Sequence, residues 1–99
     1  SRKGEATFFE PNDGSCGGKY GDMKTGLVAL SDKLMKGKSP NTEYCGRTIQ
    51  ITRGGKVATA VVADTCPECP EGNIDLDLQT FEKLGTEDEG RIPVTWCFV

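Results

Sequence analysis

The sequence contains no histidine, and this absence excludes several kinds of chemistry. A Ser-His-Asp or Cys-His catalytic system, a histidine-ligated metal site and a histidine pH switch all need the missing imidazole. Long apolar runs are missing too. No stretch approaches the roughly 18 consecutive apolar residues of a membrane helix, so the sequence contains no candidate for one. We therefore expect no membrane partner, no metal and no cofactor.

Apolar residues are scarce, at 35% of the 99 residues, so a core built from them alone would be marginal. The five cysteines suggest how the fold is held, because small secreted domains with thin cores are stapled by disulfides. We therefore expect one disulfide-stapled domain over residues 1–99 that is secreted, extracellular and monomeric. Because the sequence begins at Ser1 without a methionine or an apolar leader, we interpret it as a mature or trimmed chain.

Positive charge is not concentrated anywhere in the chain. Residues 1–57 hold 10 basic and 6 acidic residues, whereas residues 58–99 hold 2 basic and 9 acidic residues. A nucleic-acid partner needs a concentrated basic stripe that replaces phosphate counterions, and this distribution does not provide one. We therefore expect no nucleic-acid partner.

Short runs of alternating apolar and polar residues predict a mainly β fold. The clearest is a hairpin, in which residues 48–53 and 56–63 form strands around a Gly54-Gly55 turn. Further strands are expected at residues 7–9, 26–30, 73–78 and 91–99, and short helices at residues 31–35 and 79–84. Ser31 is the expected cap of the first helix, Asp77 or a neighbour caps the second, and Gly85 is its expected C′ residue. Six short strands, two small helices and no internal repeat predict a compact β-barrel.

The pair Cys66-x-x-Cys69 admits three interpretations. Thioredoxin-type redox chemistry places such a pair at a helix N-terminus in a βαβ unit, which a strand-rich sequence does not offer. A zinc site needs four ligands, and no second cysteine pair or histidine pair supplies them. A structural loop disulfide is the favoured interpretation.

The other three cysteines have no local motif. Cys16 and Cys45 each stand beside a glycine and are expected to form a second bridge, which would stabilise the fold by roughly 3–4 kcal/mol. Cys97 is then the odd one, and we expect a buried or half-buried free thiol. An intermolecular bridge, or a swapped pairing with Cys66 or Cys69, is the alternative.

Two acidic residues stand out by their surroundings. Asp64 ends an apolar strand directly before the cysteine loop, and Asp75 lies between two apolar residues that should hold it rigidly. A carboxyl group at the rim of an apolar barrel is partly desolvated, which raises its pKa and suits proton donation. The structural alternative is that Asp75 or Asp77 caps the second helix and Asp64 accepts hydrogen bonds from the cysteine loop.

Several motifs occur in an order that is typical of one family. They are residues 4–9 (GEATFF), 15–17 (SCG), 28–31 (VALS), 44–47 (YCGR), 61–69 (VVADTCPEC), 74–76 (IDL) with Phe81, and 90–96 (GRIPVTW). Through these motifs, and over nearly its whole length, the chain resembles the double-psi β-barrel domain of expansin-like proteins, also described as barwin-like. Within that group it most resembles the single-domain loosenins and the related rare-lipoprotein-A-like proteins.

The resemblance implies a six-stranded double-psi β-barrel with an open polysaccharide groove. Thr7, Asp64 and Asp75 match the family's key polar positions, and Asp75 also matches the general acid of small barrel endoglucanases with this fold. Those enzymes invert and need a second carboxylate as base, and Glu10 stands near the place of that base. The His-Phe-Asp motif around the family's acid is missing, and Cys66 stands where bacterial expansins carry a groove aromatic. Both departures point away from hydrolysis.

The function implied by the resemblance is binding and non-hydrolytic loosening of an insoluble cell-wall polysaccharide, either a β-glucan such as cellulose or chitin. Phe9, Tyr20 and Tyr44 are candidates to stack on sugar rings. We expect no second carbohydrate-binding domain after residue 99, and therefore weak affinity.

Two other functions compete with this one. Some secreted microbial proteins that resemble this chain inhibit papain-like cysteine proteases, and the candidate contacts are then the cysteine loop, residues 66–70, and the glycine-rich segment 14–21. A weak inverting endoglucanase would instead use Asp75 as acid and either Glu10 or Asp64 as base.

Overall fold

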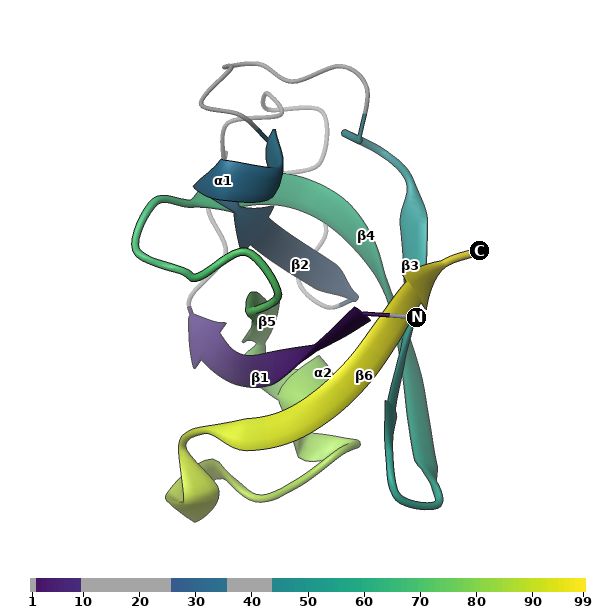
Figure 1. The fold of residues 1–99 in the computed structure, drawn as a ribbon. Helices are drawn as coiled ribbons and strands as arrows, with labels where there is room; N and C mark the ends of the chain where they lie inside the picture. The colour runs from purple at the N-terminus through teal and green to yellow at the C-terminus, as the bar shows by residue number, and fades with distance from the viewer. Residues whose placement is uncertain (1, 10–25, 36–43) are drawn as a thin grey trace.

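The computed structural model describes residues 2–9, 26–35 and 44–99, which form six strands and three short helical segments (Figure 1). The strands are β1 (Arg2–Phe9), β2 (Leu27–Ser31), β3 (Thr48–Arg53), β4 (Lys56–Cys66), β5 (Ile74–Asp77) and β6 (Ile92–Phe98). The helical segments are α1 (Asp32–Met35), α2 (Leu78–Glu82) and the 3-10 turn η2 (Glu87–Glu89). None of the helices in these ranges has the length and apolar character needed to cross a membrane.

The strands close into a barrel in the order β1-β5-β2-β4-β3-β6. Two neighbouring pairs are parallel, β1 with β5 and β2 with β4, and the other four pairs are antiparallel. This arrangement confirms the mainly β, six-stranded barrel expected from the sequence. β1 begins at Arg2 rather than at residue 7, because its polar first half pairs with β6 and so satisfies its backbone hydrogen bonds there.

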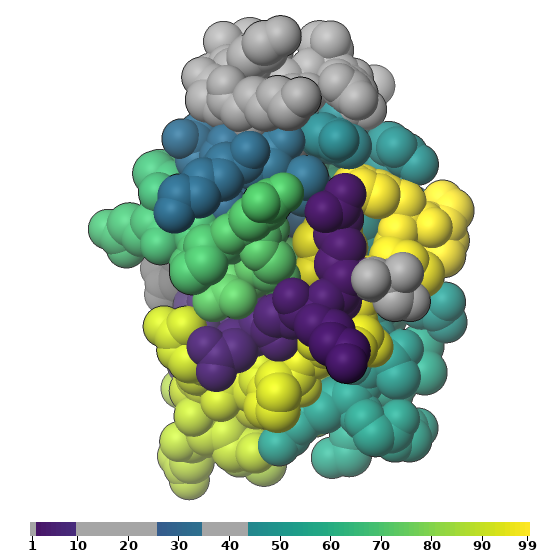
Figure 2. Space-filling model, viewed as in Figure 1, coloured from purple at the N-terminus to yellow at the C-terminus, as the bar shows by residue number. Residues whose placement is uncertain are grey.

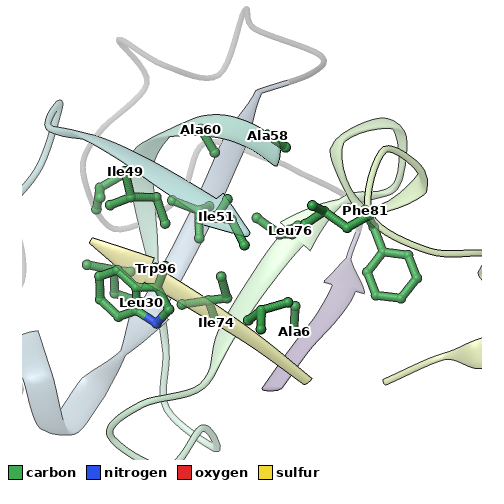
Figure 3. Packing of buried hydrophobic residues seen from close by; sticks show 14 of the residues in the cluster. Ala6, Leu30, Ile49, Ile51, Ala58, Ala60, Ile74, Leu76, Phe81 and Trp96 are labelled. Carbon is green, nitrogen blue, oxygen red and sulfur yellow. The ribbon is translucent and has the colours of Figure 1, made fainter. Parts of the chain in front are cut away.

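The interior of the barrel is filled by aliphatic and aromatic side chains, as Figure 3 shows for Leu30, Ile51 and Trp96 among others. Strand alternation sends these side chains inward: in β3, Ile49 and Ile51 are buried, and the residues between and beside them are partly exposed. Trp96 is 1% exposed, and its indole nitrogen donates a 3.0 Å hydrogen bond to the carbonyl of Gly72. The core therefore also fixes the segment that leads into β5.

Asp77 ties the start of β2 to the start of α2. Its Oδ1 accepts hydrogen bonds from the backbone nitrogens of Gly26 at 2.9 Å and Leu27 at 3.0 Å. Its Oδ2 accepts from the backbone nitrogen of Thr80, whose hydroxyl donates to Oδ1 at 2.6 Å. The expected cap at Asp77 is confirmed, and this buried carboxylate has a structural role.

The end of α2 differs from the sequence prediction. The C-cap is Lys83, in right-handed helical conformation, so Gly85 does not take the C′ position. Gly85 instead provides room, because a Cβ at this position would lie 2.7 Å from both Arg53 Nη1 and Glu89 Oε1. A side chain at this position would therefore displace the Arg53–Glu89 ion pair, a contact that helix-ending patterns in the sequence do not reveal.

Candidate functional site

The polar residues singled out from the sequence lie in one row across four neighbouring strands. Thr7 of β1 pairs with Asp75 of β5. On the other side of β5, Asp75 pairs with Ala29 of β2, and Ala29 in turn pairs with Asp64 of β4. Paired residues point to the same face of a sheet, and both neighbours of Ala29 in β2 belong to the core. The row therefore lies on the outer face of the barrel wall.

Asp75 is half-buried and is hydrogen-bonded from the neighbouring strand. The hydroxyl of Thr7 donates to Asp75 Oδ1 at 2.8 Å. Burial raises the pKa of the Asp75 carboxyl above its usual value, and the negative charges of Asp64 and Glu68 raise this pKa further. The hydrogen bond from Thr7 and the positive charge of Arg91 act on the same pKa in the opposite direction. Asp75 is thus an oriented and partly desolvated carboxyl group.

Thr7 and Asp75 line a small cleft of about 120 Å³. The other lining residues come from the cysteine loop, from the segment before β5 and from the position directly before β6: Cys66, Glu68, Cys69, Pro70, Asn73 and Arg91. Figure 2 shows the green loop that follows β4 lying against the purple β1 on this face. The cleft therefore combines a hydrogen-bonded carboxylate, a cation and a disulfide.

The cysteine loop is closed by the Cys66–Cys69 disulfide, as the structural interpretation of this pair predicts. Ser31, at the end of β2, anchors the loop to the barrel: its hydroxyl donates to the carbonyl of Cys69 at 2.7 Å. The same hydroxyl accepts from the backbone nitrogen of Lys33 at 3.1 Å, in agreement with the expected cap of the first helix. Because Ser31 is fully buried, this anchor is shielded from water.

Asp64 extends the row beyond Ala29. Its Oδ1 accepts from the backbone nitrogen of Thr65 at 2.7 Å, and it is half-buried. Asp64 is not among the residues that line the cleft, but its negative charge contributes to the raised pKa of Asp75. Only the methyl group of Ala29 separates the two acidic residues in the row, and both extend from the same side of the wall.

Neither of the aromatic candidates that the structure describes, Phe9 and Tyr44, lines the cleft. Phe9 shares the outward face of β1 with Thr7 and is half-buried, but it is not a lining residue. The ring of Tyr44 stacks on that of Phe98, with centroids 5.2 Å apart. Phe98 is the last residue of β6, whereas Arg91, which lines the cleft, directly precedes the first residue of this strand. Tyr44 therefore packs at the end of β6 that is farther from the cleft.

Three of the candidate residues, Glu10, Cys16 and Tyr20, lie outside the described residues. Cys45 takes part in a disulfide, and its expected pairing with Cys16 stays a prediction. Cys97 is a half-buried free cysteine on β6, opposite Gln50 of β3. The swapped pairing with Cys66 or Cys69 is wrong, because these two cysteines are bonded to each other.

Sequence reasoning missed two lining residues, Arg91 and Asn73. The register of β6 against β1 brings Arg91 beside Thr7, and its guanidinium forms an exposed ion pair with Glu5 at 3.3 Å. The side-chain oxygen of Asn73 accepts from the backbone nitrogen of Glu5 at 3.0 Å. Arg91 lies within the motif of residues 90–96 and Asn73 directly precedes the motif of residues 74–76, but strand register brings them to Thr7. Within the described ranges, no cluster of three or more cysteine or acidic side chains could hold a metal ion.

The sequence is similar to fungal and bacterial proteins, although no family model matches it. It is 37% identical over 110 residues to an "Allergen Asp f 7 homolog" of Arthroderma benhamiae, a match that covers 97% of this chain and 38% of that protein. It is 30% identical over 100 residues to the papain inhibitor of Streptomyces mobaraensis, covering 97% of this chain and 70% of the inhibitor. The chain thus spans well under half of the fungal relative.

Solved structures share the barrel. The Streptomyces papain inhibitor superposes with a TM-score of 0.82 at 28% identity, covering all of this chain and 96% of the inhibitor. The apo expansin of Clavibacter michiganensis superposes with a TM-score of 0.79 at 27% identity, covering 99% of this chain and half of the expansin. Cerato-platanin 3 of M. perniciosa, with a TM-score of 0.73 at 19% identity, shares the fold.

Proposed function

This chain belongs to the family of expansin-like double-psi β-barrel proteins, which includes the Streptomyces papain inhibitor, and from this premise we propose its function. We propose that this chain is a secreted protein that binds an insoluble cell-wall polysaccharide at the cleft beside Asp75 and loosens the polymer without hydrolysis. The Cys66–Cys69 disulfide supports secretion, because disulfides persist in oxidising compartments. A variant of the Clavibacter expansin was solved in complex with cellohexaose, which supports a β-glucan as the ligand.

The hydrogen bond between Thr7 and Asp75 is the observation that carries this proposal. An ionised carboxylate accepts hydrogen bonds only, and Thr7 occupies one acceptor position of Oδ1, which leaves the remaining positions for sugar hydroxyls. Partial burial strengthens such bonds relative to those made in bulk water. A glucan hydroxyl that donates to Asp75 is withdrawn from its neighbouring glucan chain. Binding therefore weakens contacts between chains while every covalent bond stays intact.

The geometry of Asp64 and Asp75 argues against these two residues acting as the base and acid of an inverting hydrolase. An inverting glycosidase needs a base on the face of the sugar opposite to the acid, with room for a water between them. Asp64 and Asp75 flank Ala29 on one face of the barrel wall, so both would approach a bound sugar from the same side. This arrangement suits a pair of hydrogen-bond acceptors along a polymer chain.

The substitution Asp75→Asn tests the proposal, because it keeps the shape of the side chain and removes the charge. The wild type should adsorb to at least one of cellulose, xyloglucan, chitin and peptidoglycan, weaken a filter-paper strip and release no reducing sugar. Asp75→Asn should reduce adsorption about tenfold, as expected for a lost hydrogen bond to a charged group. The matched control is Glu82→Gln, which removes an exposed carboxylate from α2 and should leave adsorption unchanged.

Two results would contradict this function. If the wild type adsorbs to none of these polymers, the cleft is not a polysaccharide site. If it releases reducing sugar and Asp75→Asn abolishes the release, Asp75 acts as a general acid and the protein is a hydrolase.

Inhibition of a papain-like cysteine protease is a second candidate function. It is supported by the match to the Streptomyces papain inhibitor, which extends over 97% of this chain by sequence and all of it by structure. An assay of papain activity against increasing concentrations of the protein tests it, and Asp75→Asn separates the two functions. Inhibition that survives Asp75→Asn would belong to a different surface, whereas absence of inhibition by the wild type would eliminate this function.

A further inference from the structure

We propose that the tip of the β3–β4 hairpin, residues 53–57, is the surface that enters the active-site cleft of a papain-like cysteine protease. This inference rests on the second candidate function and deepens it by naming the contact surface. The sequence directs attention to the cysteine loop and to the glycine-rich segment 14–21, and the latter lies outside the described residues. Three features of the hairpin tip favour it over the cysteine loop.

The first feature is its narrow shape. Arg53 of β3 pairs with Lys56 of β4 around a turn that consists of Gly54 and Gly55, and both glycines are exposed. A Cβ built on either glycine would meet no atom within 4 Å. In Figure 1 this turn lies at the lower end of the molecule, away from the loop that follows β4. A two-stranded tip without side chains at its turn is thin enough to enter a cleft made for an extended peptide.

The second feature is the anchoring of the tip. Arg53 Nη2 lies 2.7 Å from Glu89 Oε2, and Nη1 donates to Glu89 Oε1 at 3.1 Å and to the carbonyl of Leu84 at 3.0 Å. Glu89 is itself held, because its Oε1 accepts from the backbone nitrogen of Thr86 at 2.8 Å. Both side chains lie against Gly85, where a Cβ would displace them. A tip fixed in this way loses little conformational freedom on binding.

The third feature is the surface beside the turn. Val57 is 52% exposed and, with Val99, is one of two large hydrophobic side chains exposed to this degree in the part of the chain that the structure describes. Arg53 and Gly54 line two hollows, one of about 300 Å³ shared with β1 and β6 and one of about 540 Å³ shared with Leu84 and Glu89. Val57 therefore supplies an apolar anchor at the tip, and the hollows receive the rims of the protease cleft.

The tip is separate from the Asp75 cleft, since none of residues 53–57 lines that cleft. Protease binding and polysaccharide binding can therefore be changed independently. This separation makes the proposal testable with single substitutions in the intact chain.

Two variants test the tip. Gly55→Asn places a turn-compatible side chain where the structure has open space, and Gly55 has no positive φ that would strain it. Val57→Thr keeps the shape of the side chain and removes its apolar character. Each should raise the inhibition constant for papain about tenfold or more. Gly55→Asn widens a turn that must fit inside the protease cleft, and Val57→Thr places an unpaired hydroxyl in an apolar contact. Thr59→Val is the matched control, because Thr59 is exposed on the same strand, two positions beyond Val57.

Melting temperatures close to that of the wild type, together with unchanged polysaccharide adsorption, are expected for all three variants. If the wild type inhibits papain and both tip variants inhibit it equally well, this surface assignment is overturned while the inhibitor function stands. If the wild type does not inhibit papain, the inhibitor function and this assignment fail together. Weaker inhibition by Gly55→Asn and Val57→Thr, but not by Thr59→Val, supports the proposal.

Discussion

Thr7 Oγ1 donates a 2.8 Å hydrogen bond to Asp75 Oδ1, although the two residues stand 68 positions apart in the sequence. The bond forms because β1 and β5 are parallel neighbours, in a register that also pairs Ala6 with Ile74 in the core. A shift of one residue in this register would turn Thr7 inward and an apolar residue outward. The packing of the core and the geometry of the candidate site are thus set by the same strand pairing.

The pKa of Asp75 should respond in opposite directions to two substitutions in the row. Thr7→Val removes a hydrogen bond that lowers this pKa, so the pKa should rise further. Asp64→Asn removes a negative charge that raises it, so the pKa should fall. A ¹³C NMR titration of the Asp75 carboxyl carbon measures both shifts. Shifts of the same sign in both variants would contradict the arrangement described for this row.

The Arg53–Glu89 ion pair should make stability depend on pH in the acid range. The hydrogen bond from Arg53, followed by that from the backbone of Thr86, lowers the pKa of Glu89 from 4.5 to about 2. A group whose pKa is lowered by folding stabilises the folded state above its unfolded pKa, and this stabilisation is lost as the pH falls toward 2. Because the pair is partly exposed to solvent, its contribution should be modest.

Glu89→Gln tests this contribution. Its melting temperature should lie below that of the wild type at pH 7, and the difference should shrink below pH 4.5 and vanish near pH 2. Circular dichroism melts from pH 2 to pH 7 measure the two curves. Curves that run parallel over this whole range would mean that the ionised Glu89 side chain does not stabilise the fold.

The barrel was largely predictable from local sequence, whereas the way in which the candidate site residues meet was not. Alternation predicts the β3–β4 hairpin, and the apolar neighbours of Asp75 single it out, because strand period and turn chemistry are local properties. Arg91 lies beside Thr7 through the pairing of β6 with β1, and the guanidinium of Arg53 lies against Gly85. Both facts depend on contacts between distant segments, which no local pattern encodes.

Asp77 should matter far more for stability than Asp75. Asp77 is 1% exposed and accepts hydrogen bonds from Gly26, Leu27 and Thr80, so Asp77→Ala leaves several buried donors without partners. We expect a loss of about 3 kcal/mol or more in the free energy of unfolding. Asp75→Asn, at a half-buried position with one cross-strand hydrogen bond, should change it by less than about 1 kcal/mol. Urea unfolding monitored by circular dichroism compares the two variants.

Loss of the Cys66–Cys69 disulfide should affect the cleft more than it affects the fold. The bridge joins residues only three positions apart, so the chain-entropy model gives it about 2 kcal/mol of stabilisation. Both cysteines line the cleft, however, and the loop between them carries Glu68. A Cys66→Ala, Cys69→Ala double variant should therefore remain folded and lose most of its adsorption to polysaccharide.

The comparison for this variant is Cys97→Ala, which removes a free thiol that is not among the cleft residues and should leave adsorption unchanged. Urea unfolding shows whether both variants are fully folded in buffer without urea. Their adsorption to polysaccharide is then compared in that buffer. Full adsorption by the double variant would show that the cysteine loop is not a wall of the binding site. It would leave Thr7 and Asp75 as the part of the cleft that contacts the polymer.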